Sequence, residues 1–210
     1  MKRALLCAAL AASFLILLTT PATSQNVSIV PNGGISKDMR SETSNRWNMG
    51  FNVGALIYFQ ASDLISVGGR VAYHSWGADG EGWLKDYDPS VSYTIESTSG
   101  SQSVIEIVPF VRIATSRSDN PVKLYVQVGG GLFLVSPGDV TVKGSYRTAF
   151  SFGTGEISFK NESMTGFGIQ AGLPISISRL LQILPIYSLY WADGDAYHHY
   201  AINIGVTLGN

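Results

Sequence analysis

The sequence predicts an all-β protein, an eight-stranded antiparallel up-and-down transmembrane β-barrel, and three observations carry this prediction. Several segments alternate in character with a period of two, which is the periodicity of strands with two different faces. The more apolar face of these segments carries no charged residue. All 23 glycines lie after residue 24, mostly inside the alternating segments, although glycine ordinarily weakens a strand.

The chain begins with a segment typical of a secretory signal peptide. A positively charged start is followed by an almost wholly apolar run that ends at Leu18, and small residues come next. The run is too short for a comfortable transmembrane helix of about 20 residues. We therefore expect residues 1–24 to be a signal peptide and residues 25–210 to form one barrel domain. Cys7 is the only cysteine and lies in the signal, so the mature chain can form no disulfide and no cysteine–zinc site.

Eight segments are candidate strands, seven of them clear and the first one weaker. In chain order the candidates are 26–31, 46–59, 67–76, 104–113, 123–135, 165–175, 182–191 and 199–208. The first is interrupted by Pro31 and by Asn32-Gly33-Gly34, which are unfavourable inside strands. No segment shows a convincing helical periodicity. Eight strands would bring both ends of the mature chain to the same end of the barrel.

The connections alternate between short turns and long loops, as in an up-and-down meander. The short turns are 60–65, 115–121 and 176–181, and the long loops are 32–45, 78–102 and 136–162. Within the last loop, "VTVKGSY" and "EISFKNE" also alternate. This pattern predicts a hairpin that extends the neighbouring strands beyond the membrane.

The two faces of the strands predict lipid outside and a crowded polar lumen inside. A charge that faces the middle of a membrane costs about 2–4 kcal/mol, so lipid would remove charges from the outer face. The opposite face carries amides, glycines and a few charges, which suits a narrow barrel filled by side chains. The predicted polar network of the lumen comprises Asn48, Asn52, Arg70, His74, Glu106, Arg112, Gln127 and Gln170.

The short turns predict which residues face one another. The expected cross-strand pairs are Arg70 with Gly54, His74 with Gly50, Arg112 with Tyr125 and Glu106 with Gly131. Glu106 is the acid placed inside the strands, and a buried charge needs a partner. We therefore expect Glu106 to pair with Arg70, with Arg112 or with both.

Aromatic residues gather at the ends of the predicted strands. Trp47, Trp76, Trp191 and Tyr200 fall at the long-loop ends, whereas Tyr58 and Phe59 fall at a short turn. Two such bands are typical of the two interfaces of a membrane. The alternative interpretation is that aromatic residues are simply common in strands.

The segments "GFNVGALIYFQASDLISVGGRVAYHSW" and "NPVKLYVQVGGGLFLV" resemble those of small outer-membrane β-barrel proteins of Gram-negative bacteria, the OmpA/OmpX type. The resemblance implies a barrel with short periplasmic turns and longer extracellular loops, with both termini in the periplasm. Its implied partners are outer-membrane lipid and, during biogenesis, the barrel assembly machinery and periplasmic chaperones. The chain departs from the family at its end, which reads Leu208-Gly209-Asn210 where an aromatic residue is frequent.

Little in the sequence points to chemistry, and we predict no catalytic residue, no cofactor and no metal. His198 and His199 would point to opposite faces of a strand, so they cannot chelate one ion together. Asp193-Gly194-Asp195 is either a weak cation site or a solvated turn. Removal of the basic start leaves more acidic than basic residues, which does not favour a nucleic-acid partner.

The function predicted is a structural or surface-interaction role in the outer membrane, without a wide pore. An extracellular ligand would bind the loops 78–102 and 136–162, although an acidic solvated loop is the simpler interpretation of the first. One alternative is an outer-membrane enzyme that modifies lipid, suggested by His74-Ser75 near Asp79. The other is a secreted soluble barrel that carries an apolar ligand.

Overall fold

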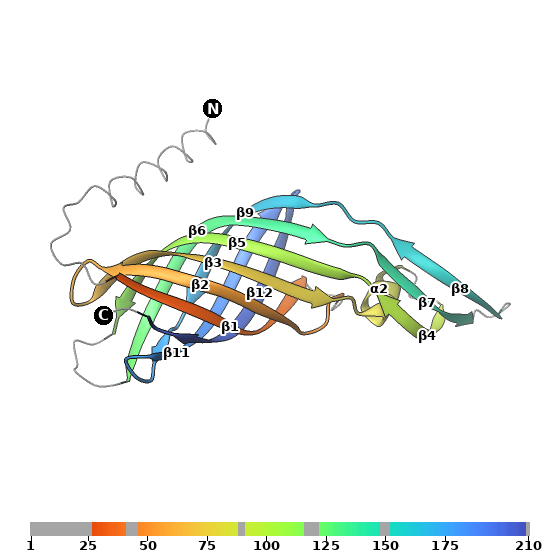
Figure 1. The fold of residues 1–210 in the computed structure, drawn as a ribbon. Coiled ribbons are helices and arrows are strands. Elements are labelled where there is room, and N and C mark those ends of the chain that lie inside the picture. Colours follow the sequence, from red (N-terminus) through yellow and green to blue (C-terminus); the bar gives the residue numbers. More distant parts are fainter. Residues whose placement is uncertain (1–26, 41–45, 88–90, 116–121, 148–151, 209–210) are drawn as a thin grey trace, which may run out of the picture.

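The computed structural model describes residues 27–40, 46–87, 91–115, 122–147 and 152–208, and it shows a closed antiparallel barrel of eight strands (Figure 1). The barrel strands are β1 (Val27–Arg40), β2 (Gly50–Gln60), β3 (Ile65–Gly77), β5 (Ser101–Ala114), β6 (Lys123–Pro137), β9 (Met164–Gly172) with its short continuation β10 (Ile175–Ser176), β11 (Leu181–Ala192) and β12 (Asp195–Val206). The barrel closes because β1 pairs with both β2 and β12, while β9 pairs with both β6 and β11. The predicted fold class and strand count are confirmed. The expected signal peptide lies outside the described residues.

The first strand is much longer than the sequence indicated. β1 runs through Pro31 and the two glycines to Arg40, so most of the expected loop 32–45 is strand. Gly34 suits the strand because β1 packs very closely on β12 at this position. A Cβ atom on Gly34 would lie 1.9 Å from the carbonyl oxygen of Ile202 on β12. Glycine here is a requirement of the strand pairing.

Two of the expected long loops are folded. Residues 78–102 contain helix α2 (Gly80–Tyr87) and strand β4 (Ser92–Ser99), and residues 136–162 contain strands β7 (Val140–Arg147) and β8 (Phe152–Phe159). The predicted β7–β8 hairpin is present, and β4 joins it to form a separate three-stranded sheet. We call β4, β7, β8 and α2 the extension. Figure 1 shows it projecting from one end of the barrel, while β1 begins and β12 ends at the other. The helix α2 has eight residues, about two turns, which is too short to give a helical periodicity in the sequence.

The predicted cross-strand pairs are wrong by two residues. Arg70 pairs with Leu56 and His74 with Asn52, while Arg112 pairs with Gln127 and Glu106 with Phe133. In both hairpins the turn is displaced along the chain relative to the expectation. A slip of two residues keeps every side chain on its face, so alternation cannot detect it.

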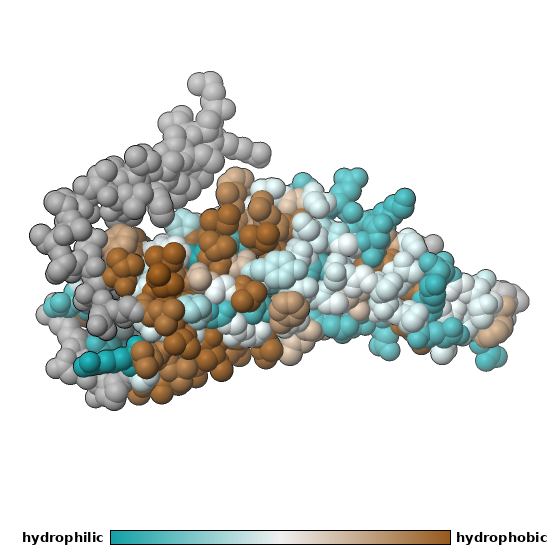
Figure 2. Space-filling model, in the orientation of Figure 1, coloured by the Kyte–Doolittle hydropathy of each residue, from teal (hydrophilic) through white to brown (hydrophobic). Residues whose placement is uncertain are grey.

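The outward face of the barrel is apolar around its whole circumference. All eight barrel strands expose large hydrophobic side chains, among them Phe51, Val71, Ile107, Val128 and Ile204. Figure 2 shows such residues gathered over the barrel, whereas the extension is mostly pale or hydrophilic on the same side. Among the described side chains of the barrel strands, Lys37 is the one charged residue at an outward-facing position of the alternation. Its Nζ donates a hydrogen bond to the carbonyl oxygen of Trp47, near the extension.

The barrel interior is layered, and β11 shows the order most clearly. From the end opposite the extension, its buried side chains are Gln182, then Leu184 and Ile186, then Ser188, then Tyr190. The aliphatic pair belongs to an apolar cluster with Val30, Leu56 and Phe110. Tyr190 belongs to a larger apolar cluster that reaches into the extension and includes Trp47, Trp76, Trp83, Phe133 and Val140. Polar side chains therefore lie between two apolar clusters. No helix of the described chain is long and apolar enough to cross a membrane.

Candidate functional site: a buried carboxylate cluster

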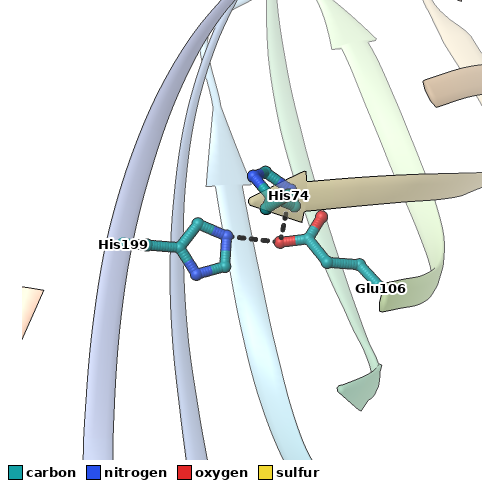
Figure 3. Close-up of side chains that lie close together, drawn as sticks. All are labelled: His74, Glu106 and His199. Atoms are coloured by element: carbon teal, nitrogen blue, oxygen red, sulfur yellow. Dashed lines mark hydrogen bonds and ion pairs between the residues drawn. The ribbon is translucent and has the colours of Figure 1, made fainter. Parts of the chain in front are cut away.

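The carboxylate of Glu106 lies at the centre of the polar layer. Alternation on β5 turns Glu106 into the interior together with Arg112, whereas Ile105 and Ile107 point outward. Strand β3 brings Arg70 and His74 to the same place, and β12 brings His199. Figure 3 shows the two imidazole rings directed at one carboxylate. The side chains of this layer are essentially inaccessible to solvent, namely those of Glu106, Arg70, His74 and His199.

Both oxygens of Glu106 accept hydrogen bonds. Oε2 accepts one hydrogen bond from Arg70 Nη1 and another from Gln170 Nε2 at 3.1 Å. Arg70 and Glu106 also form a salt bridge. Oε1 accepts one from Ser188 Oγ at 3.1 Å and lies 2.5 Å from Nε2 of His199. The carboxylate is thus held from several directions, with the cation on one oxygen and the histidine on the other.

His74 differs from the other members of the cluster. Its Nε2 lies 3.4 Å from Oε1 of Glu106, and neither ring nitrogen has a hydrogen-bond partner among the described residues. The ring stacks on Trp76 with a centroid separation of 5.4 Å and an interplanar angle of 15°. It also lies 4.7 Å from the ring of His199. Packing therefore fixes the His74 ring in a position where its polar atoms are not satisfied by protein groups.

Arg112 occupies a second polar layer, nearer the end opposite the extension. Its guanidinium donates to Oε1 of Gln127 at 3.0 Å and to Oε1 of Gln182 at 3.2 Å. The same group lies 4.6 Å from the ring centre of Tyr58 and 5.4 Å from that of Tyr125. Among the described residues, two amide oxygens and aromatic faces stabilise this cation.

The structure brings together some of the residues in the predicted polar network and separates others. Arg70, His74 and Gln170 meet Glu106, whereas Arg112 with Gln127 forms the second layer. Asn52 is buried in the interior on β2. Asn48 is the exception, because it precedes β2, which begins at Gly50. Its side chain is exposed and donates to the carbonyl oxygen of Ala78 at 3.0 Å.

The predicted interface aromatics divide in the same way. Trp191 and Tyr200 are exposed on the outward face, and Phe59 is half-buried. Trp47 and Trp76 are instead buried in the interior, so their assignment to the interface was wrong. Trp76 shares the parity of His74 and therefore points inward. Tyr58 also points inward, where its hydroxyl accepts a hydrogen bond from Gln182 at 3.1 Å. Trp47 precedes the strand, where alternation no longer applies.

Several interior residues were absent from the predicted network. His199 and Gln182 contribute to the two polar layers, and Gln102 donates to Asp38 Oδ2 at 3.1 Å in a further buried contact. Ser188, which alternation along 182–191 places on the polar face with Asn203 of 199–208, joins the Glu106 layer. The signal for His199 was available, because it shares the inward parity of Asn203 on β12. Alternation does not predict Asp38, because Pro31 and Asn32-Gly33-Gly34 obscure the strand pattern of β1.

The cluster has the donor atoms of a metal site, whereas His74 and Ser75 do not form a nucleophile–base pair. Ligand atoms of His74, Glu106 and His199 all lie within 4.8 Å of one another. Ser75 follows His74 on β3 and points to the opposite face, so the two cannot act as nucleophile and base. The chemistry suggested by His74-Ser75 in the sequence is therefore not supported by their placement.

The fold and the placement of its side chains define a class: a small closed β-barrel that exposes apolar side chains and buries charged ones. Solved structures with a similar fold include Ail of Yersinia pestis, at 13% identity over 88% of this chain and 99% of that chain, with a TM-score of 0.47. Neisserial surface protein A gives 14% identity, 88% and 97% coverage and a TM-score of 0.47. The N-terminal β-barrel domain of OprF of Pseudomonas aeruginosa is 11% identical over 87% of this chain and 97% of that chain, with a TM-score of 0.38.

The likeness to these structures is one of fold, and sequence identities this low carry no information about function. No protein-family model matches the chain, and no curated protein matches it in sequence.

Proposed function

We propose that the chain is an integral outer-membrane barrel with a structural or surface-interaction role and with an interior filled by side chains. The observation that carries this proposal is the belt of exposed apolar side chains on all eight barrel strands. Burying such a belt in lipid is favourable, whereas leaving it in water would promote aggregation. The signal-peptide pattern of residues 1–24 supports export of the chain.

The side chains of the interior also disfavour the alternative function of a soluble carrier of apolar ligands. Such a carrier would line its interior with apolar side chains and turn polar ones toward water. Here the buried positions include Arg70, Glu106, Arg112 and Gln127, while Val128 and Ile204 are exposed. The distribution is that of a protein whose outer solvent is lipid.

One substitution separates membrane insertion from solubility. Val128 is 57% exposed on the outward face of β6. Val128→Lys should weaken the inserted barrel by about 2–4 kcal/mol if the site faces the membrane midplane, less near an interface. A soluble protein would tolerate this change. Thr154→Lys, on an exposed position of β8 in the extension, is the matched control and should have no effect.

The measurements are the fraction retained in membranes after an alkaline wash and the shift in gel migration on boiling, because closed barrels resist unfolding. Recovery of the wild-type chain as a soluble periplasmic protein would contradict the proposal. Equal behaviour of the two lysine variants would contradict the assignment of the outward face to lipid.

Any recognition role belongs to the extension, which we place outside the cell. A hollow of about 270 Å³ lies there, lined by apolar and aromatic side chains that include Leu84, Tyr93, Ile95, Tyr146 and Ile157. A rigid barrel that carries such a projection can vary its surface without losing its fold. Protease added to intact cells should cleave the extension and leave the barrel protected. Cleavage only after the outer membrane is opened would reverse the proposed orientation, in which both termini are periplasmic.

A further inference from the structure

We propose that His74, Glu106 and His199 bind one divalent ion of the zinc class inside the barrel. Two imidazole nitrogens and one carboxylate oxygen form a donor set that Zn²⁺ commonly takes in proteins. Here the three side chains come from β3, β5 and β12, are fully buried, and bring their ligand atoms within 4.8 Å of one another. The inference goes beyond the proposed membrane role and does not depend on it.

One ligand spacing in the cluster matches that around a bound ion, and a second would have to widen. With metal–ligand distances of about 2.0–2.2 Å, ligand atoms around a tetrahedral zinc lie about 3.3–3.6 Å apart. His74 Nε2 and Glu106 Oε1 are 3.4 Å apart, which matches that edge. His199 Nε2 is closer to the same oxygen, at 2.5 Å. Binding would therefore require the His199 ring to retreat by about 1 Å.

His74 supplies an independent reason. A fully buried imidazole whose two nitrogens lack hydrogen-bond partners is costly, because it has lost its water without replacement. Stacking on Trp76 holds this ring with Nε2 toward Glu106 (Figure 3), at a separation from Oε1 that is longer than an ordinary hydrogen bond. Coordination of an ion would satisfy Nε2 where the ring already stands.

The charges around the cluster place the ion on one side of the carboxylate. Arg70 and Gln170 hold Oε2, which leaves Oε1 facing the two histidines. A divalent ion on Oε1 is therefore separated from the guanidinium by the carboxylate itself. Ser188 Oγ, 3.1 Å from Oε1, or a water would complete the coordination.

The test uses the full mature chain. The protein is unfolded in urea with a chelator, refolded into detergent without metal and then exposed to a small excess of Zn²⁺. We expect about one zinc per folded chain by elemental analysis. Co²⁺, as an optical substitute, should give the visible bands of a tetrahedral site with nitrogen and oxygen ligands. Folded wild-type protein that binds no zinc would overturn the proposal and leave the cluster as a hydrogen-bond network holding water only.

The neighbouring histidine provides a matched control. His74→Gln and His199→Gln should each lower zinc affinity at least about 100-fold. His198→Gln should leave it unchanged, because His198 points outward and contacts Tyr187 Oη at 2.5 Å. Undiminished zinc affinity in both ligand variants would overturn the proposal. If either ligand variant fails to fold, zinc-edge X-ray absorption of the wild-type protein decides, since two imidazole ligands are required and a shell without them overturns the assignment.

Discussion

At the scale of the residue, one carboxylate ties together much of the barrel. Glu106 stands on β5 and accepts hydrogen bonds from Arg70 on β3, Gln170 on β9, Ser188 on β11 and His199 on β12. Five strands therefore meet at two oxygen atoms. A buried ion pair of this kind contributes little net stability when intact, but removal of one partner leaves the other charge buried and unpaired.

Glu106→Ala should accordingly destabilise the barrel by about 3–5 kcal/mol, less where interior water reaches Arg70. The measurement is urea unfolding in detergent or lipid, followed by gel migration. Glu156→Ala is the matched control, because Glu156 forms an exposed ion pair with Lys143 in the extension. That change should cost no more than about 1 kcal/mol. A Glu106→Ala variant with wild-type stability would refute the importance of the pairing.

A second residue-scale prediction concerns the glycines of the close strand contacts. Gly34→Ala should cost about 1–3 kcal/mol, because the new Cβ would overlap the carbonyl oxygen of Ile202 and the strands must move apart. Gly69→Ala is its control, since a Cβ there meets nothing within 4 Å. It should change the unfolding free energy by no more than about 0.5 kcal/mol. Equal urea midpoints for the two variants would show that the β1–β12 pairing has more room than the structure indicates.

At the scale of the element, alternation predicted which side of each strand faces the interior but not the position of its partner. Alternation correctly placed Glu106 and Arg70 on the buried face. The cross-strand partner expected for each of them was two residues away from the partner in the structure. The missing information is the turn geometry, which sets the register. β1 was underestimated for a different reason. Glycine and proline count against a strand in isolation, whereas the close contact with β12 requires glycine.

The extension illustrates a further limit of sequence patterns. Its β7–β8 hairpin has a period of two and was predicted, but α2 is recognisable only by its packing. Trp83 of α2 lies 5.5 Å from the ring of Trp47 in an edge-to-face contact and 4.9 Å from Phe159. Such a short helix is stabilised by these tertiary contacts more than by its own propensity.

Deletion of residues 80–98 tests the independence of barrel and extension. We expect the barrel to insert and to keep its shift in gel migration, because the β3–β5 ladder begins beyond the deletion with Gly77 opposite Ser101. The remaining β7–β8 hairpin should become sensitive to protease, since it loses β4 and the packing of α2. Loss of insertion would show that the extension belongs to the folding core of the barrel.

At the scale of the whole molecule, the two apolar clusters of the interior frame the Glu106 layer on both sides. The cluster around Trp76 and Phe133 lies toward the extension, and the one around Leu56 and Phe110 lies toward the opposite end. Ions cross apolar constrictions poorly, because they must shed water without a polar replacement. An interior arranged in this way should not conduct.

We therefore expect the purified protein in a planar bilayer to show no steady open channel. Leu56→Ser together with Phe110→Ser removes apolar side chains from the cluster around Leu56 and Phe110. The double variant should show more frequent brief conductance events, and its shift in gel migration on boiling checks that the barrel still folds. Large and stable conductance of the wild-type protein would refute a filled interior.

The three-stranded sheet of the extension has another consequence, which concerns how many copies can share a crowded surface. A barrel has no free edge, but β4 and β8 are the edge strands of this sheet, and unpaired edges invite pairing between molecules. The β4 flank is interrupted by a bulge between Ile95 and Ser97, with Glu96 exposed at that point. On β8, Gly155 and Glu156 reduce the β-forming character of the strand. Neighbouring copies should thus remain separate even at high density, because neither flank offers a long, flat and uncharged template.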